Sequence, residues 1–330
     1  MQEEGLRLPV RILDAPPPEP VLLVDGVFDA PGLNLSHWPG HRTPQALRHD
    51  LSTGSVLAFA RLPEDERTRL ASGCTAIANN HYDTDGTCAL FAARFPHLAL
   101  PRADRLLACA RAGDFFQLPD LDAYRIDLIV AGLATAPSPL HTELANQPNL
   151  ARWQRQTDYL LEHFPALLDG DLAPLRDLWA PGIARLEEDL AELSRARRTD
   201  APRLDLTVYE GGPNLRPGRH ALHGSSDSDR ILVLASSTEG LLVRLLFSTL
   251  SWFDLVSAPR LPRPSLEALT ARLNELEGTT DAEVRWRTHP TGGAAPELWF
   301  GAEGVAKYAE HNEGLAASGL GREVVLGVLR

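Results

Sequence analysis

The sequence predicts an α/β fold with a largely parallel sheet and flanking helices, plus a smaller C-terminal α+β domain. Three observations lead to this prediction. Short apolar or β-branched runs that end on turn residues alternate with helical segments in the first half of the chain, which is typical of parallel sheets. Strand-like runs predominate in the last third. The length of 330 residues exceeds that of most single cores, so we expect more than one domain.

The chain divides into four expected regions. Residues 1–20 are proline-rich and predict an extended lead-in, and residues 21–148 hold the alternating α/β pattern. Amphipathic spacing interrupted by prolines predicts a helical connector over residues 149–200. Residues 201–330 form the expected α+β domain. The prolines that we expect to break the connector helices are Pro165, Pro174 and Pro181.

Local signals place the individual elements. Thr43 and Pro44 predict a helix over residues 45–51, because threonine is a good N-cap and proline is preformed for the first helical turn. Ser265 is the expected N-cap of a helix that extends to Leu276. The other expected helices cover residues 87–95 and 102–115, and residues 127–132 fit either a strand or a helix start. The expected strands cover residues 21–24, 33–35, 74–80, 204–210, 231–237, 241–257, 283–289 and 297–301.

Charge and composition exclude several functions. The formal net charge of -12 disfavours binding to long nucleic-acid duplexes, which requires clustered cations. The only lysine is Lys307, which rules out a P-loop. The three cysteines lack CxxC spacing, so we expect neither a disulfide framework nor a cysteine zinc site. Because the chain has no apolar run of roughly 18 residues and no signal peptide, we expect a cytoplasmic protein without a membrane partner.

The most informative segment runs from His81 to Gly86 and lies between an apolar strand and a helix. Alternate residues of an extended chain share a face, so His81, Asp83 and Asp85 are expected to project together from the strand end. Imidazole and carboxylate ligands together suit Mn²⁺ or Mg²⁺ better than a closed zinc site. A plain aspartate turn remains the alternative. A calcium loop is excluded, because Ala92 occupies the twelfth position, where a glutamate is needed.

The segment TAIANNHYDTDGTCALFA, residues 75–92, resembles the first motif of the DHH phosphoesterases, a His-x-Asp-x-Asp-Gly between a strand and a helix. This resemblance implies an α/β domain that binds two manganese ions and a smaller C-terminal substrate domain. It also implies hydrolysis of phosphoester or phosphodiester bonds. The combination of LSHWPGHRTP and NNHYDTDG also resembles a group of uncharacterised bacterial proteins, for which the resemblance supplies no activity.

The other three DHH motifs have counterparts here in a different order. In the family, the first motif is followed by a strand ending in aspartate, a strand ending in Asp-His-His, and a further metal-binding aspartate. Asp25, His37 and Asp114 resemble these in turn, but Asp25 and His37 precede His81. The chain therefore resembles a circularly permuted relative. We then expect the strands that end at Asp25, His37 and His81 to be neighbours, with Asp114 approaching from a helix end.

The sequence departs from the family in two places. Ser36-His37-Trp38 stands where the family has Asp-His-His, and His41 is the candidate to replace the missing imidazole. The glycine-rich substrate motif of the second domain is also missing, and its nearest substitute contains Arg219, His220 and His223. If this stretch is extended, His220 and His223 face opposite sides, so at most one of them faces a ligand.

The resemblance implies a metal-dependent hydrolase of a small phosphoester, a nucleotide or a short oligonucleotide. The alternative is a non-catalytic metal-containing binding protein with a degenerate site. We expect one or two divalent ions, with Mn²⁺ before Mg²⁺, bound by residues 21–148, and a substrate or cap role for residues 201–330. A small phosphorylated substrate is the expected partner, and a homodimer is left open. The expected site residues are His41 and Asp85 for catalysis, Arg42, Arg219 and His223 for substrate binding, and Asp25, His37, His81, Asp83, Asp85 and Asp114 for metal.

Overall fold

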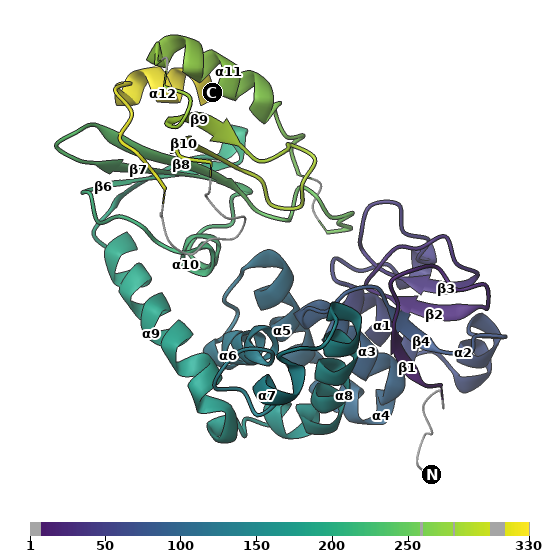
Figure 1. Cartoon of the computed structure of the whole chain (residues 1–330). Helices are drawn as coiled ribbons and strands as arrows, with labels where there is room; N and C mark the ends of the chain where they lie inside the picture. Colours follow the sequence, from purple (N-terminus) through teal and green to yellow (C-terminus); the bar gives the residue numbers. More distant parts are fainter. Residues whose placement is uncertain (1–7, 258–259, 280, 304–313, 330) are drawn as a thin grey trace. The chain divides into compact units, whose positions relative to one another are not determined.

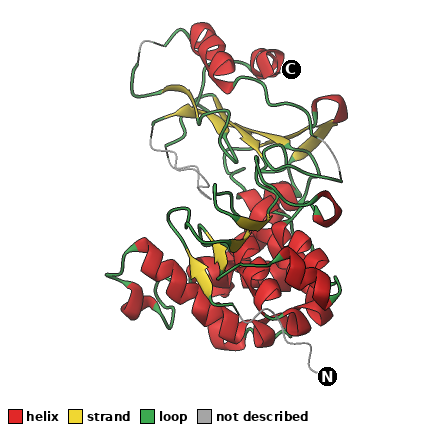
Figure 2. Cartoon of the chain, turned by 90° about the vertical axis from the view of Figure 1, so that its right-hand side faces the viewer, coloured by secondary structure: helices red, strands yellow, loops and turns green. Residues whose placement is uncertain are grey.

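The computed structural model describes residues 8–257, 260–279, 281–303 and 314–329. The chain forms two compact units. The first comprises Met1–Ile183 together with Phe253–Ala258, and the second comprises Ala184–Trp252 together with Pro259–Arg330. Helices predominate in the first unit and strands in the second (Figure 2). The mixed α/β fold class predicted from the sequence is confirmed.

The sheet of the first unit is parallel, as the sequence predicted. Its strands are β1 (Val10–Ile12), β2 (Val21–Val24), β3 (Gly32–Leu35) and β4 (Ile77–Asn79), in the order β1-β4-β2-β3 (Figure 1). Every pairing is parallel, so the strands preceding Asp25, His37 and His81 end at one edge of the sheet. Residues 1–20 were expected to form only an extended lead-in, but part of this segment forms β1, which pairs with β4.

Helices cover this sheet and form most of the first core. α3 (Thr84–Arg94) is buried from Thr84 to Ala93, and its Phe91 meets Phe164 edge to face at 5.6 Å between ring centroids. Phe164 belongs to α8 (Asn149–Leu168), so the expected connector is in part a core helix of this unit. The remaining helices of this unit are α1 (Ser52–Ala60), α2 (Glu64–Leu70), α4 (Pro96–Ala99), α5 (Ala103–Phe115), α6 (Leu121–Gly132) and α7 (His141–Leu144). α9 (Arg176–Leu193) begins in the first unit and continues into the second.

Several local expectations were wrong. The helix expected over residues 45–51 is only a 3₁₀ turn, Gln45–Leu47, and α1 begins at Ser52. The intervening residues are held by tertiary hydrogen bonds, because the Asp50 carboxylate accepts the amides of Val256 and Ser257. Pro165 and Pro181 lie inside α8 and α9 and do not end them. Residues 127–132 are the end of helix α6.

The second unit is built on a mixed six-stranded sheet. The order is β5-β6-β7-β8-β10-β9, and only the β6–β7 pair is parallel. Ser265 caps α11 (Leu266–Glu277) as predicted, because its side chain accepts the Ala268 amide. The other elements are β5 (Arg197–Ala201), β6 (Leu206–Gly211), β7 (Arg230–Ser236), β8 (Leu241–Phe247), β9 (Arg285–Thr288), β10 (Glu297–Gly301), α10 (Arg219–Gly224) and α12 (Arg322–Leu329).

The strand expected over residues 241–257 stops at Phe247. The next residue, Ser248, turns the chain, since its hydroxyl donates to Asp229 Oδ1 at 2.6 Å and accepts the Leu250 amide at 3.1 Å. The last five residues of the expected strand, Phe253–Ser257, belong to the first unit.

Three buried charged side chains of the second unit, which we call the ion trio, form two ion pairs. Glu297 contacts Arg219 through Oε1 at 2.6 Å and Arg244 through Oε2 at 2.8 Å, and all three side chains are buried. Burial raises the pKa of Glu297, but the two guanidinium groups lower it, and the net pKa lies below the usual range. Arg219 also donates to the carbonyl groups of Phe247 and Ala295. The structure therefore does not support the predicted role of Arg219 in clamping a phosphate.

His223 is the other residue of this unit with a predicted role in substrate binding. It lies in α10, so this segment is helical and not extended. The side chain is buried, and burial lowers the pKa of His223 well below its usual value, with Arg219 and His220 acting in the same direction. A neutral, buried imidazole of this kind is typical of a core residue.

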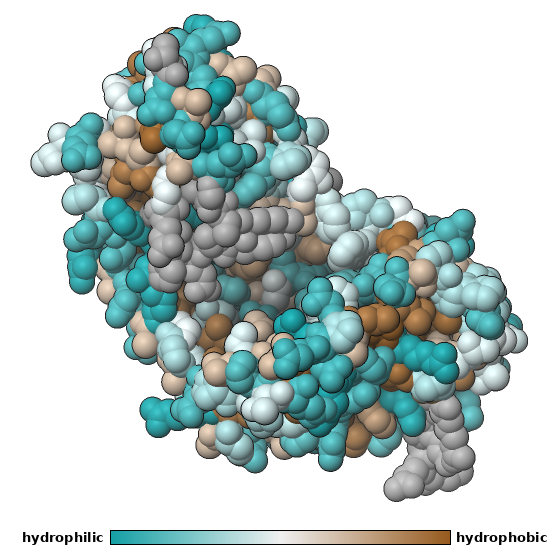
Figure 3. Space-filling view, viewed as in Figure 1, coloured by the Kyte–Doolittle hydropathy of each residue, from teal (hydrophilic) through white to brown (hydrophobic). Residues whose placement is uncertain are grey.

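In the described part of the chain, no helix is both long enough and apolar enough to cross a bilayer. The face seen in Figure 3 is mostly hydrophilic, with apolar side chains in smaller areas.

We expect Glu297→Gln to lower the free energy of unfolding by about 3–5 kcal/mol, because it leaves two buried guanidinium groups without their counter-charge. The matched control is Glu275→Gln, which removes an exposed partner of Arg272 and should cost no more than about 0.5 kcal/mol. Urea denaturation followed by circular dichroism measures both. Equal losses in the two variants would show that the trio contributes no more than a surface pair.

Candidate metal centre

The His81–Gly86 segment leaves β4 and starts α3. Asp83 is the N-cap of α3, with an extended backbone, and its Oδ1 accepts the Gly86 amide at 2.8 Å. Asp85 already lies in the first helical turn. The alternation expected for His81, Asp83 and Asp85 therefore ends at Asp83. The helical twist directs Asp85 into a different group of ligands from the one that His81 and Asp83 form.

The first group consists of Asp25, His81 and Asp83. Their ligand atoms all lie within 4.8 Å of one another. His81 Nε2 is 3.1 Å from Asp25 Oδ2 and 2.8 Å from Asp83 Oδ2. The other ring nitrogen, Nδ1, is 2.8 Å from Asn80 Oδ1. One imidazole and two carboxylates thus converge at the end of β4 and could hold a metal ion.

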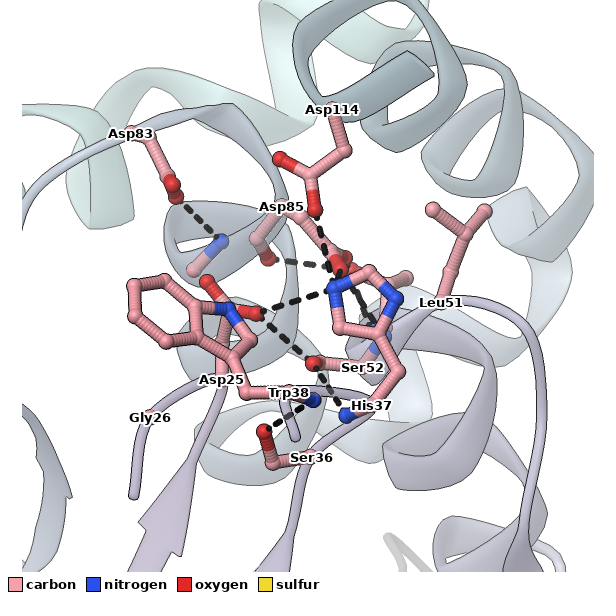
Figure 4. Close-up of polar contacts among 12 residues, drawn as sticks. Asp25, Gly26, Ser36, His37, Trp38, Leu51, Ser52, Asp83, Asp85 and Asp114 are labelled. Carbon is pink, nitrogen blue, oxygen red and sulfur yellow. Dashed lines mark hydrogen bonds and ion pairs between the residues drawn. The ribbon is translucent and has the colours of Figure 1, made fainter. Parts of the chain in front are cut away.

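The second group consists of Asp25, His37, Asp85 and Asp114, all of them buried. His37 Nε2 is 3.0 Å from Asp114 Oδ2, 3.6 Å from Asp85 Oδ2 and 3.7 Å from Asp25 Oδ1 (Figure 4). Asp25 thus belongs to both groups and presents a different oxygen to each histidine. All six residues predicted from the sequence as metal ligands are brought together here.

Asp25 achieves this position with an unusual backbone. Its φ of 49° lies in the left-handed region, which aspartate tolerates better than most residues but at some cost in energy. The residue follows β2 directly and precedes Gly26. Backbone strain of this kind is found where function requires a fixed side-chain position.

The start of α1 holds two of these carboxylates. The amides of Ser52 and Thr53 donate to Asp85 Oδ2 and Oδ1, each at 2.8 Å. The Ser52 hydroxyl donates to Asp25 Oδ1 at 2.7 Å. Sequence reasoning missed this support, although a Ser-Thr pair that opens a helix is a recognisable source of free amides.

His37 is oriented by the backbone. Its Nδ1 lies 2.5 Å from the carbonyl oxygen of Asp50, which only a protonated Nδ1 can approach so closely as a donor. In the neutral ring, Nε2 then carries the lone pair, and it makes no hydrogen bond among the described residues. A lone pair facing three carboxylate oxygens is repulsive unless a cation or proton lies between them. A metal-ligating histidine held by a carbonyl group has this arrangement.

The pKa shifts in the two groups also indicate that a bound cation would stabilise them. Burial raises the pKa of Asp25 and of Asp114 well above the usual range, and the neighbouring carboxylates of Asp83 and Asp85 raise both further. Burial lowers the pKa of His81, but Asp83 and Asp25 raise it, and the net pKa lies well above normal. Crowded carboxylates in a low dielectric bind protons or metal ions to relieve their repulsion.

Comparison with known proteins identifies the family but no activity. A family model matches residues 12–329, nearly the whole chain. The chain belongs to DUF6687, a family of unknown function. Neither the curated proteins nor the solved structures give a match. The function of this DUF6687 chain therefore has to be inferred from its site.

Two predicted site residues of the DUF6687 chain lie outside both groups. His41 Nδ1 accepts the Thr43 amide at 3.2 Å, and its Nε2 is 3.1 Å from Asp254 Oδ2. Both ring nitrogens are thus engaged, so His41 does not replace the missing imidazole of the DHH motif. Arg42 is exposed, and its guanidinium donates to the Ala30 carbonyl. The structure supports neither a catalytic His41 nor an Arg42 clamp.

Aromatic rings lie against both histidines. Trp38 packs beside His81, with ring centroids 4.8 Å apart. Phe253 stacks on His37, with centroids 3.8 Å apart and planes 18° from parallel. No signal in the sequence pointed to Phe253, which lies in the C-terminal half of the chain.

A cavity of about 320 Å³ adjoins the first group of ligands. Asp83 is part of its lining, and so are Asp127 of α6 and Arg152, Trp153 and Gln156 of α8. Arg152 forms no ion pair within the described part of the chain. A guanidinium group and an indole ring are therefore available beside one of the candidate metal ligands.

We expect metal-free protein to lose stability as the pH rises from about 5 to about 8. The raised pKa values of Asp25, Asp114 and His81 mean that the folded state binds more protons than the unfolded chain in this range. Their contribution is complete below the unfolded values, about 3.9 for Asp and 6.5 for His, and is lost as the pH passes the raised folded values.

Urea unfolding at a series of pH values, in the presence of EDTA, measures this slope. Asp25→Asn should flatten it, since one titrating group is removed. Stability that rises with pH through the same range would show that these groups are not crowded as described.

Proposed function

We propose that this chain is a divalent-metal-dependent hydrolase of the DHH phosphoesterase type, acting on a small phosphoester, a nucleotide or a short oligonucleotide. The observation that carries the proposal is the sharing of Asp25 between two groups of ligands. A carboxylate that presents one oxygen to each of two sites is suited to bridge two metal ions. The six residues are those that the family resemblance predicts.

The residues fit a pair of ions. His81, Asp83 and Asp25 would hold one, and Asp25, His37, Asp85 and Asp114 would hold the other. The ligands are oxygen and imidazole without thiolate, which favours Mn²⁺ and then Mg²⁺. When bound, two such ions supply a nucleophile from water at neutral pH and offset charge on the phosphoryl oxygens.

The sheet order supports circular permutation. β2 and β3, which precede Asp25 and His37, come before β4 in the chain. In the sheet, β2 lies directly beside β4, and β3 lies on the other side of β2. Asp114 comes from the last turn of α5, as the fourth motif would require. A permuted chain changes where the polypeptide is cut without changing which strand ends meet.

The cavity at Asp83 is where we place the group esterified to the phosphate. Arg152 can form paired hydrogen bonds with a phosphate or a similar anion. Trp153 offers an aromatic face, on which a planar ring such as a nucleobase would stack. The volume of about 320 Å³ and the net charge of -12 both favour a small substrate over a long polymer.

We expect the wild-type chain to bind two Mn²⁺ ions. Asp83→Asn and Asp85→Asn should each bind one, because each removes a ligand from a single group, and Asp25→Asn should bind neither. Asp122→Asn, which changes an aspartate paired with Arg125 outside both groups, is the control and should bind two. Elemental analysis after chelation, reloading and gel filtration gives the counts. Wild-type content in all the aspartate variants would place the metal elsewhere.

We expect Mn²⁺-loaded protein to cleave at least one member of a panel of phosphomonoesters, phosphodiesters and dinucleotides. Asp85→Asn should lower turnover by about a hundredfold or more, and EDTA should abolish it. If no phosphoester is cleaved, and EDTA only lowers the melting temperature, the chain is a metal-containing binding protein and the hydrolase proposal fails.

The role of the cavity has its own control within the same assay. Arg152→Gln should raise KM by about tenfold with little change in kcat, since it removes a substrate-binding group that is not itself a candidate metal ligand. Arg155→Gln removes a charge from the same helix, where Arg155 pairs with Glu143, and should leave KM unchanged. Equal effects of the two variants would remove Arg152 from substrate binding.

A further inference from the structure

A short segment from the C-terminal half of the chain contacts a residue of the candidate metal centre. Phe253–Ser257 belongs to the first unit, although Ala184–Trp252 and the residues from Pro259 onward belong to the second. We call Phe253–Ser257 the return segment. It follows the turn after β8, and it contains no helix or strand of its own. Its contacts fall on His37 and on the residues that hold His37.

The return segment contacts His37 directly in two ways. The Phe253 ring stacks on the imidazole and also meets the Phe115 ring edge to face, with centroids 5.9 Å apart. The Asp254 amide donates to the His37 carbonyl oxygen at 2.9 Å. One face of the imidazole is therefore covered by an aromatic ring, and the backbone of the same residue is hydrogen-bonded.

The return segment also holds the residue that orients His37. Asp50 Oδ1 accepts the Val256 and Ser257 amides at 2.7 and 2.9 Å, and its Oδ2 accepts the Ser257 hydroxyl. The carbonyl oxygen of the same Asp50 contacts His37 Nδ1. The aspartate is thus fixed by its side chain to the return segment and fixes the histidine by its backbone.

A third attachment uses His41. Its Nε2 lies 3.1 Å from Asp254 Oδ2, and the Thr43 amide fixes the other side of the ring. His41 thus faces the return segment through its ring nitrogen. This accounts for a buried histidine that is close to the metal ligands in sequence but is not one of them.

We propose that the return segment is a positioning element for His37, and that the ion bound by His37, Asp85, Asp114 and Asp25 reaches full affinity only when this segment is docked. The proposal rests on the metal-binding part of the proposed function and not on the reaction. Stacking against Phe253 restricts rotation of the imidazole and excludes water from one face. Both effects keep Nε2 directed at the three carboxylates.

Docking and metal binding are then reciprocal. If docking strengthens metal binding, metal binding must strengthen docking by the same factor. A return segment that served only as packing would not respond to the ion. The amides of Asp254, Val256 and Ser257 are hydrogen-bonded only when the segment is docked, so their exchange with solvent reports docking directly.

The first test uses full-length variants titrated with MnCl₂ by calorimetry, without substrate. Phe253→Ala should weaken one of the two binding steps by about 10- to 100-fold, which is typical of residues that orient a ligand, and should leave the other step within about threefold. Phe253→Tyr retains the ring and should restore the affinity. Val256→Ala, which truncates an exposed side chain of the same segment, should match wild type. Two unchanged steps in a folded Phe253→Ala variant would overturn the proposal.

The second test uses wild-type protein and does not depend on a variant that folds. Hydrogen exchange followed by mass spectrometry should show slower exchange in the peptide covering residues 253–257 when MnCl₂ is added. Unchanged exchange with Mn²⁺ bound would overturn the proposal while leaving the hydrolase standing. Slower exchange in a protein that cleaves no phosphoester would support the positioning role and refute the hydrolase.

Discussion

The fold depends on the burial of Asp25 between two imidazoles. A carboxylate with both oxygens directed at histidines, and three further aspartates nearby, is stable in a protein interior only with compensating positive charge. The surroundings serve this requirement. α1 directs its first amides at Asp85, β2 is followed by a residue with left-handed backbone, and the Asp50 carbonyl fixes the tautomer of His37. The first unit thus gathers four aspartates and two histidines that a bound cation would stabilise.

Much of this arrangement could be predicted because parallel strands end at one edge of a sheet. Polar residues after β2, β3 and β4 therefore had to meet, whatever the order of the strands in the chain. The ligands Asp25, His37 and His81 follow from that rule. Asp114 could be selected only through the proposed resemblance to the DHH phosphoesterases, since a helix end can face many directions.

What the sequence could not reveal depends on contacts between distant residues. Residues 45–51 carry good helix signals, but hydrogen bonds from Val256 and Ser257 to Asp50 hold part of that stretch extended. Arg219 looked like a phosphate ligand because nothing local shows that Glu297 takes its charge. The apolar run 241–257 reads as one strand, and only the fold shows that Phe247 and Phe253 belong to different units.

The return segment also sets the timing of assembly during synthesis. A ribosome makes the chain from the N-terminus, and domains usually fold in that order. Here the six candidate metal ligands are all synthesised by residue 114, but the ring that covers His37 is synthesised only at residue 253. The first unit therefore cannot be complete until residues 184–252 of the second unit have been synthesised. A nascent chain, or a transcript cut short before that point, would carry every ligand of the centre and still lack its finished form.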